Sequence, residues 1–154
     1  MTFFTRALMA STVTAYAVSA WAGLGDAEGS VNRDKVRMSA RHTVTSVSQY
    51  SVHDLVTPEG GRFREYVSAS GVVFAVAWHA LYKPDLSTIL GSSYPAYVQS
   101  AKVAAQQGGI KRQFRLTALD LVVHSASHLN VFSGYAYRNS MLPQSFNLPD
   151  LSVQ

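Results

Sequence analysis

The residue types that acid–base chemistry needs are concentrated in one stretch of the chain, FREYVSASGVVFAVAWHALYKPDL, which spans residues 63–86. It contains Glu65, His79 and Asp85. A carboxyl group among apolar neighbours has a raised pKa and can serve as a general acid or base. An aspartate can also orient a histidine that acts as a base. These three residues are therefore the candidates for a catalytic site.

Two of these residues also have a structural interpretation, which we favour. Glu65 shares a strand face with Phe63 and Val67, so it can lean inward and be satisfied by a basic side chain or by backbone amides. Asp85 follows Pro84 and can cap the helix that begins there. On this interpretation the protein has no catalytic residues.

The histidines raise the question of a metal site. His124 and His128 are four residues apart, a spacing that places two imidazoles on one face of a helix for zinc. The surrounding sequence predicts a strand, a turn and a strand instead, so the two rings would have to approach across a hairpin, with His42 or His53 joining them. The alternative is that these histidines are exposed or singly hydrogen-bonded. Because no phosphate-binding loop, dinucleotide fingerprint, calcium loop or nucleophile elbow is present, we expect no cofactor.

Aromatic residues provide the candidates for binding. Tyrosines on a helix stripe and on a strand face can line a groove for a peptide, a glycan or a partner protein. They can equally form the core between helix and sheet, with their hydroxyl groups at its rim. The candidate binding residues are Arg64, Trp78, Tyr94, Tyr97 and Tyr135, and the aromatic set also includes Phe132 and Tyr137.

The elements that would position these residues follow from the apolar pattern. Residues 44–56, 62–68 and 72–80 alternate or run apolar as strands do, and 114–125 and 129–138 predict two more, joined by a turn near Ala126. A helix is expected to start at Pro84 and, after Gly91, to continue to Gln107. The order β-β-β-α-β-β predicts an α+β domain, a mostly antiparallel sheet of about five strands with a helical segment packed on one face. In the third strand, alternation places Phe74 on the face of Trp78.

The start of the chain predicts export. Arg6 precedes an uncharged stretch, residues 7–20, and Ala20-Trp21-Ala22 matches the small-x-small pattern of a cleavage site. We therefore expect a signal peptide over residues 1–22 and one exported domain over 23–154, with a loose leader at 23–32 and an irregular tail at 141–154. The protein would be periplasmic or secreted, with no stable membrane insertion after cleavage.

Composition excludes several functions. The chain has no cysteine, which rules out thiolate catalysis and cysteine-based zinc sites. Removing Arg6 from the 13 basic residues leaves 12 against 9 acidic ones. This small, dispersed surplus does not predict nucleic-acid binding, which needs a concentrated basic surface.

Three segments together resemble a known family: REYVSASGVVFAVAW, PDLSTILGSSYPAY and LVVHSASHLNVFSGYAY. The chain resembles, from about Val31 to Pro143, a family of small exported bacterial proteins classified as a domain of unknown function, number 2844. It departs from that family where Ala80-Leu81 replaces a Gly-Pro step after the tryptophan. The resemblance implies export and a single domain, and it implies no activity, cofactor or catalytic residue.

We therefore expect a non-enzymatic binding or interaction module of the cell envelope, which acts through a sheet face or edge. Its partner would be an envelope protein, a peptide or a glycan. The alternative is a small hydrolase or metal-dependent enzyme that uses His79, Asp85 and Glu65, or His124 and His128. A third hypothesis is an assembly factor that works only with a partner.

Overall fold

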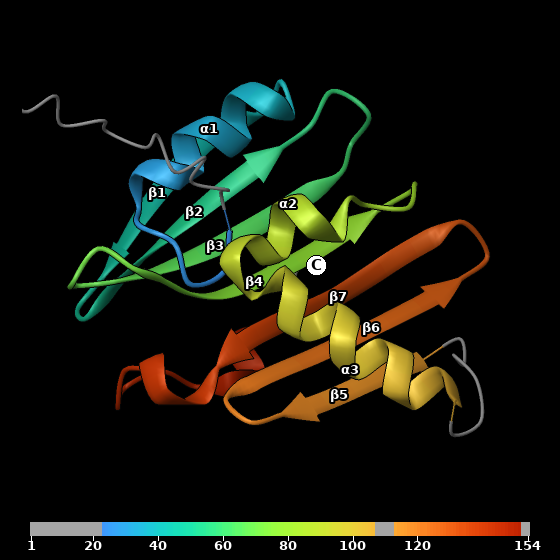
Figure 1. Cartoon of the computed structure of the whole chain (residues 1–154). Helices are drawn as coiled ribbons and strands as arrows, with labels where there is room; N and C mark the ends of the chain where they lie inside the picture. Colours follow the sequence, from blue (N-terminus) through green and yellow to red (C-terminus); the bar gives the residue numbers. More distant parts are fainter. Residues whose placement is uncertain (1–22, 107–112, 152–154) are drawn as a thin grey trace, which may run out of the picture.

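A computed structural model of the protein describes residues 23–106 and 113–151. Its strands form one antiparallel sheet in the order β1-β2-β3-β4-β7-β6-β5 (Figure 1). The strands are β1 (Arg41–Val47), β2 (Tyr50–Val56), β3 (Arg62–Ser68), β4 (Val73–Ala80), β5 (Gln113–Ala118), β6 (Leu121–His128) and β7 (Val131–Arg138). The helices are α1 (Gly29–Arg37), α2 (Leu86–Leu90) and α3 (Tyr94–Gln106), with short 3-10 turns η1 (Gly91–Ser93), η2 (Asn139–Met141) and η3 (Leu148–Asp150). The predicted signal peptide lies outside the described residues.

The predicted α+β class and the antiparallel sheet are confirmed, but the sheet has seven strands and not five. Residues 44–56 and 114–125 were each expected as one strand, but each is divided by a turn between two paired strands. Their turns contain no glycine or proline, and the expected turn at Ala126 lies inside β6. Leu119 and Leu129, which begin two of the turns, have φ values of 53° and 55°. Leucine rarely adopts that conformation, so the turn-favouring residues there are only Asp120 and Asn130, which follow the two leucines.

The chain passes through the same order of elements twice. First α1 precedes the meander β1–β4, and then α2 and α3 precede the meander β5–β7. Each meander ends on a central strand, and these two strands, β4 and β7, pair antiparallel. The two halves therefore share a similar order of elements, and their last strands meet at the centre of the sheet.

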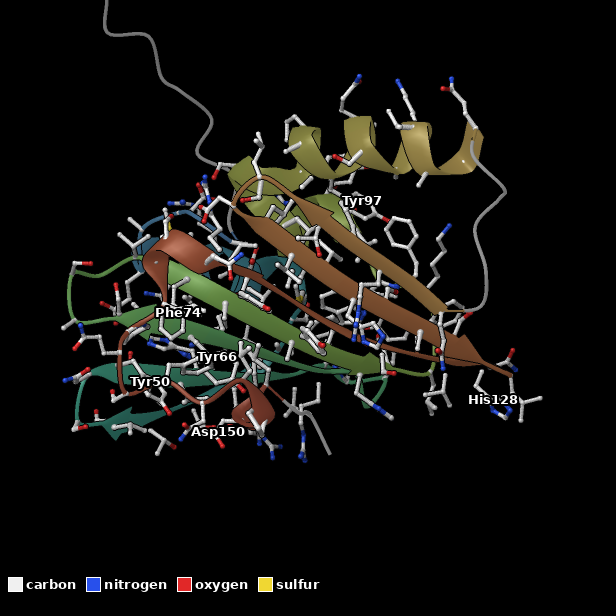
Figure 2. All side chains as sticks on the ribbon, turned by 90° about the horizontal axis from the view of Figure 1, so that it is seen from below. Tyr50, Tyr66, Phe74, Tyr97, His128 and Asp150 are labelled. Carbon is white, nitrogen blue, oxygen red and sulfur yellow. The ribbon has the colours of Figure 1, made fainter. Side chains whose placement is uncertain are left out.

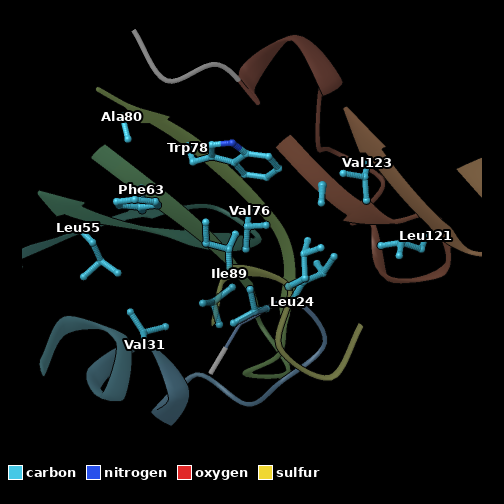
Figure 3. Close-up of a cluster of buried hydrophobic side chains, with 14 of the residues drawn as sticks. Leu24, Val31, Leu55, Phe63, Val76, Trp78, Ala80, Ile89, Leu121 and Val123 are labelled. Carbon is cyan, nitrogen blue, oxygen red and sulfur yellow. The ribbon is translucent and has the colours of Figure 1, made fainter. Parts of the chain in front are cut away.

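The helices all lie on one face of the sheet, which we call the helix face (Figures 1 and 2). The main core lies beneath them and includes fully buried Trp78, Val76 and Leu55 (Figure 3). Tyr97 on α3 packs into it beside Phe114 of β5, with ring centroids 5.9 Å apart. A helix lying across one face of an antiparallel sheet is the arrangement that the element pattern predicted.

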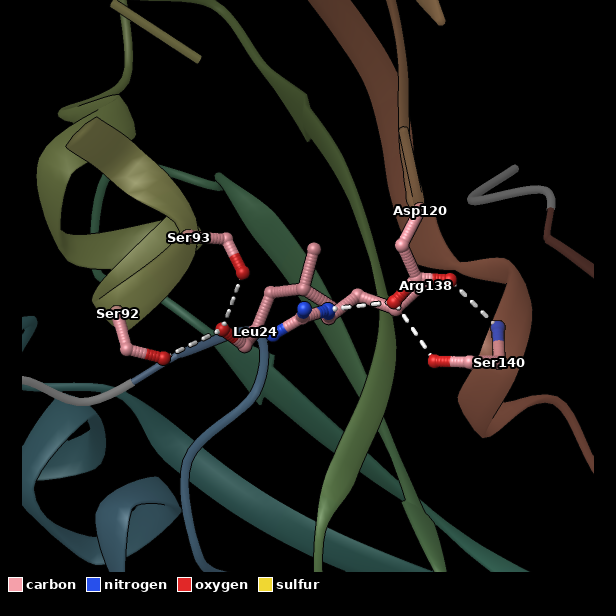
Figure 4. A network of polar contacts seen from close by, with 6 residues as sticks. All are labelled: Leu24, Ser92, Ser93, Asp120, Arg138 and Ser140. Carbon is pink, nitrogen blue, oxygen red and sulfur yellow. Dashed lines mark hydrogen bonds and ion pairs between the residues drawn. The ribbon is translucent and has the colours of Figure 1, made fainter. Parts of the chain in front are cut away.

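The segment that was expected to be a loose leader, residues 23–32, is instead ordered against the sheet and contributes Leu24 and Val31 to the core. Leu24 is wholly buried, and its carbonyl oxygen accepts hydrogen bonds from the hydroxyl groups of Ser92 and Ser93 (Figure 4). The backbone of Gly25 and Asp26 bonds to Val73 at the start of β4. Small and polar residues indicated flexibility, but here they let the backbone pass close between the sheet and the start of α3.

A β-bulge reverses the faces at the start of β4. Tyr66 lies opposite Ala75, whereas the next residue of β3 lies opposite Val73, so Phe74 is the extra residue. The expected placement of Phe74 beside Trp78 is therefore wrong: it packs against Tyr66 on the other face, with ring centroids 6.2 Å apart. Simple alternation fails wherever a bulge inserts a residue.

The irregular tail crosses this second face, which carries no helix and which we call the open face. Phe146 makes edge contacts with the rings of Tyr50, Tyr66 and Phe74, and its centroid lies 4.9 Å from that of Phe74. The hydroxyl of Tyr66 donates to the carbonyl of Asp150 at 2.7 Å. Where the tail begins, Asp120 holds it by accepting from Arg138 and from Ser140 (Figure 4).

Candidate functional site

A row of polar and aromatic side chains crosses the open face at right angles to the strands. Residues that lie directly opposite one another in an antiparallel pair share a face, and the strand registers extend this relationship from strand to strand. The row runs Asp54, Arg64, Ala77, Tyr135, His124 and Arg115, from β2 to β5. A second row beside it runs Arg62, His79, Ser133, Ala126 and Gln113.

The first row joins two of the candidate binding residues, Arg64 and Tyr135, with His124, which was a candidate metal ligand. Only Ala77 separates Arg64 from Tyr135. The rings of His124 and Tyr135 are tilted against each other with centroids 5.2 Å apart. Arg64 also donates from Nε to Oδ1 of Asp54 at 2.7 Å, which fixes its guanidinium above the sheet.

A hollow of about 250 Å³ lies in this part of the open face. Its lining includes His124 and Tyr135 together with Ser133 and the tail residue Leu151. Trp78 also borders the hollow, although its side chain belongs to the core of the helix face and is 1% exposed. The hollow therefore offers aromatic and small side chains at its base and polar groups at its edge.

The open face is basic. Asp54 is the only carboxylate that its strands contribute, because Glu65, the other acidic residue within a strand, lies on the helix face. Against it stand the four arginines Arg41, Arg62, Arg64 and Arg115, and the face also carries His79, His124 and His128. A surface of this sign favours a negatively charged partner.

The predicted catalytic residues are not brought together. Glu65 pairs with Val76 on the helix face, whereas His79 lies on the open face of β4. Asp85 is the N-cap of α2, where it accepts from the backbone and hydroxyl of Ser87 and from the hydroxyl of Thr88. Burial acts to raise the pKa of Asp85, but these hydrogen bonds outweigh it and lower the pKa. Asp85 is thus a helix-capping residue, as the structural interpretation of the sequence predicted.

The remaining predicted residues lie in different places. Tyr94 and Tyr97 stack on α3 with centroids 6.1 Å apart and pack against the core of the helix face. His124 and His128 lie on the same strand, four residues apart, which separates them by roughly 13 Å. That distance is too long for two ligands of one ion. No three histidine or carboxylate side chains in residues 23–106 and 113–151 come together to hold a metal ion.

The structure contains one acidic pair that sequence reasoning missed. Asp34 on α1 and Glu65 on β3 are 0% and 4% exposed, and their carboxyl groups interact with each other in the interior. Burial raises the pKa of Asp34 to about 6, against the lowering effect of Arg37 and Arg33. Burial, and then the charge of Asp34, raises the pKa of Glu65 well above its usual range. The available signal was the polar pair Ser30 and Asp34, which shares with Val31 the face that α1 buries.

Next to this pair lies a pair of histidines. His53 is directly opposite Glu65 in the sheet, and its Nδ1 lies 3.1 Å from Nε2 of His42, with the rings stacked 5.1 Å apart. Its Nε2 lies 3.0 Å from the hydroxyl of Ser51 and 3.5 Å from a carboxylate oxygen of Glu28. Burial lowers the pKa of both histidines, and in His53 the neighbouring ring lowers it further. Both rings are therefore neutral at pH 7.

A groove separates the end of α1 from the start of α2. One part, of about 200 Å³, is lined by Met38, Phe63 and Ile89, and a second part, of about 380 Å³, extends past Thr57 and Glu59. Arg37 and Tyr82 line both parts. The guanidinium Nη1 of Arg37 donates to the hydroxyl of Thr88 at 3.0 Å, so a hydrogen bond joins α1 to α2 across the groove.

The chain belongs to the family described as protein of unknown function (DUF2844), which it matches over residues 20–151. The predicted resemblance is thereby confirmed. No curated protein and no solved structure matches the chain. Within the described part of the chain, no helix has the length and apolar character needed to cross a membrane.

Proposed function

We propose that this member of the family is a non-enzymatic binding module of the cell envelope, which holds its partner on the open face of the sheet. The partner would be an envelope protein, a peptide or a glycan. The row Arg64, Tyr135, His124 and Arg115 is the observation that carries the proposal. Export to the periplasm or the medium is part of it and rests on the predicted signal peptide, which makes envelope components the available partners.

The chemistry of the row supports a partner with negative charge and some apolar surface. Arginine pairs in two-pronged fashion with carboxylate and phosphate groups, and a tyrosine ring provides a flat, amphipathic contact at little entropic cost. Because the side chains project from paired strands, their spacing is set by the sheet and not by mobile loops. Such a site is preorganised, which favours binding.

The alternative, a small hydrolase or metal-dependent enzyme, has less support. Glu65 and His79 lie on opposite faces of the sheet, and Glu65 with its partner Asp34 is closed off from solvent. A catalytic group must reach its substrate to within hydrogen-bond distance. An enzyme would need to open the helix face first.

Binding can be tested with substitutions on the row. We expect Arg115→Ala and Tyr135→Ala each to weaken retention by an acidic polysaccharide or an envelope extract about tenfold, as hot-spot residues do. Mobility in native gels that contain acidic or neutral polysaccharide measures retention by the polysaccharide. Capture from the envelope extract measures retention by envelope components. Lys102→Ala on α3 is the matched control, because it removes a positive charge from the opposite side of the molecule. Equal retention of all variants would contradict the proposal.

A further inference from the structure

The contact between α1 and the sheet depends on an acidic pair more than on apolar packing. Within α1 only Ser30, Val31 and Asp34 are buried, so the helix contributes one apolar side chain to the core. Helices in proteins are held mainly by an apolar face. Here the buried face instead presents a carboxyl group to Glu65.

Protonation determines whether that contact is favourable. Among the described residues, no hydrogen-bond partner is found for Oδ1 and Oδ2 of Asp34, for Oε2 of Glu65 or for the hydroxyl of Ser30. Two buried carboxylates side by side repel each other strongly, whereas a carboxyl group and a carboxylate share a proton in a short hydrogen bond. Because no other donor satisfies these buried oxygens, the pair is favourable only when one of its two groups carries a proton.

The charged neighbours do not replace that proton. Arg33 and Arg37, on α1, attract the charge of Asp34 but make no hydrogen bond to the pair. Asp26, in the segment before α1, acts on both carboxyl groups as a like charge. From the sheet, His53 on β2 lies beside Glu65, and beyond it are Glu28 and His42; His42 in turn faces Lys35. The two histidines are neutral, so they leave the acidic pair without a compensating cation.

We propose that the proton shared by Asp34 and Glu65 is a latch that holds α1 on the sheet, and that its loss at rising pH loosens α1 and widens the groove between α1 and α2. The end of α1 forms one wall of that groove through Arg37 and Met38. When α1 moves, the hydrogen bond from Arg37 to Thr88 breaks and the wall moves with it. In an exported protein the external pH sets the protonation of the acidic pair directly, so the position of α1 would change with that pH. The inference does not depend on the proposed binding at the open face.

The test is hydrogen exchange of the α1 amides, measured by mass spectrometry from pH 4 to pH 8 and corrected for the intrinsic pH dependence of exchange. Opening of α1 lets the pKa of Asp34 return from about 6 to 3.8, so protection changes by a factor of ten for each pH unit between these two values, or roughly a hundredfold in all. We expect the protection of residues 29–37 to fall by about that factor between pH 4 and pH 6 and to fall further above pH 6, as Glu65 loses its proton, while that of β6 and β7 stays constant.

Substitutions assign the effect to the pair. Asp34→Asn and Glu65→Gln each replace one carboxyl group of the pair by an amide that donates at every pH, so we expect the protection of α1 to vary much less with pH in both. Asp120→Asn is the control, because it removes a carboxylate that pairs with Arg138 away from α1 and should keep the wild-type dependence. Constant protection of α1 in the wild type would overturn the proposal whether or not the variants fold. So would an unchanged pH dependence in a folded Asn or Gln variant.

Discussion

The indole ring of Trp78, on β4, lies against the backbone of Gly134, directly opposite it on β7. A β-carbon at position 134 would collide with the ring and with the backbone carbonyl of His124 on β6. Trp78 is among the largest fully buried side chains of the described residues. The absence of a side chain at one position of β7 therefore makes room for the centre of the core.

Gly134→Ala should destabilise the protein by about 1–3 kcal/mol, the usual cost of overpacking a core. Urea denaturation followed by tryptophan fluorescence measures the change. Gly29→Ala is the matched control, since nothing lies within 4 Å of an added β-carbon there. Because alanine favours a helix over glycine, that variant should be as stable as the wild type or up to about 1 kcal/mol more stable. A Gly134→Ala protein of wild-type stability would show that the ring shifts freely.

Phe146→Ala should detach the tail from the open face. The ring packs against Tyr50, Tyr66 and Phe74 with centroids 4.9–5.4 Å away, so its loss should cost about 3 kcal/mol. Limited proteolysis should then cut the tail faster, and thermal denaturation should show the lost stability. Leu148→Ala, at a side chain 46% exposed, should change stability by no more than about 0.5 kcal/mol. Equal effects of the two substitutions would contradict this account of the tail.

Asp85→Ala should cost about 1 kcal/mol through loss of the N-cap of α2, whereas Asp85→Asn should cost much less. The reason is that asparagine can still accept from the backbone of Ser87, as Asp85 does at 2.9 Å. Chemical denaturation of the two variants measures the difference. If asparagine destabilises as much as alanine, the charge of Asp85 matters beyond the cap.

The paired histidines should reduce stability in acid. A histidine whose pKa is lowered by folding stabilises the native state above its unfolded value of 6.5 and loses that contribution as the pH falls toward its folded value. Melting temperatures between pH 7 and pH 4.5 should therefore fall less in His42→Gln than in the wild type. His79→Gln, on the opposite face, should follow the wild type. The acidic pair, whose pKa values are raised, instead adds stability as the pH falls. Because that contribution is present in every variant compared, the difference between His42→Gln and the wild type reports the histidines. Parallel curves for His42→Gln and the wild type would exclude this role.

The sequence alone was sufficient for the α+β class, the antiparallel sheet, β3, β4 and the start of α2. These depend on local chemistry: alternation in residues 62–68, a long apolar run before His79, and Pro84 followed by a capping aspartate. The strand number was wrong because the chain turns at Ser48-Gln49 and at Leu119-Asp120, where no glycine or proline marks a turn. Leu119 and, in the next turn, Leu129 have positive φ values. The pairing of strands on both sides holds each leucine in a conformation that its own type disfavours.

Tertiary structure alone decided which residues meet. Alternation tells which residues of one strand share a face, but not which residues of the neighbouring strand lie opposite them. The row from Arg64 to Arg115 is therefore visible only once the registers of β3, β4, β7, β6 and β5 are known. Nor does alternation show that Asp34 would lie against Glu65. The sequence determined that Glu65 leans toward an apolar face. Only the packing of α1 on that face gave it a second carboxyl group, and with it a proton to share.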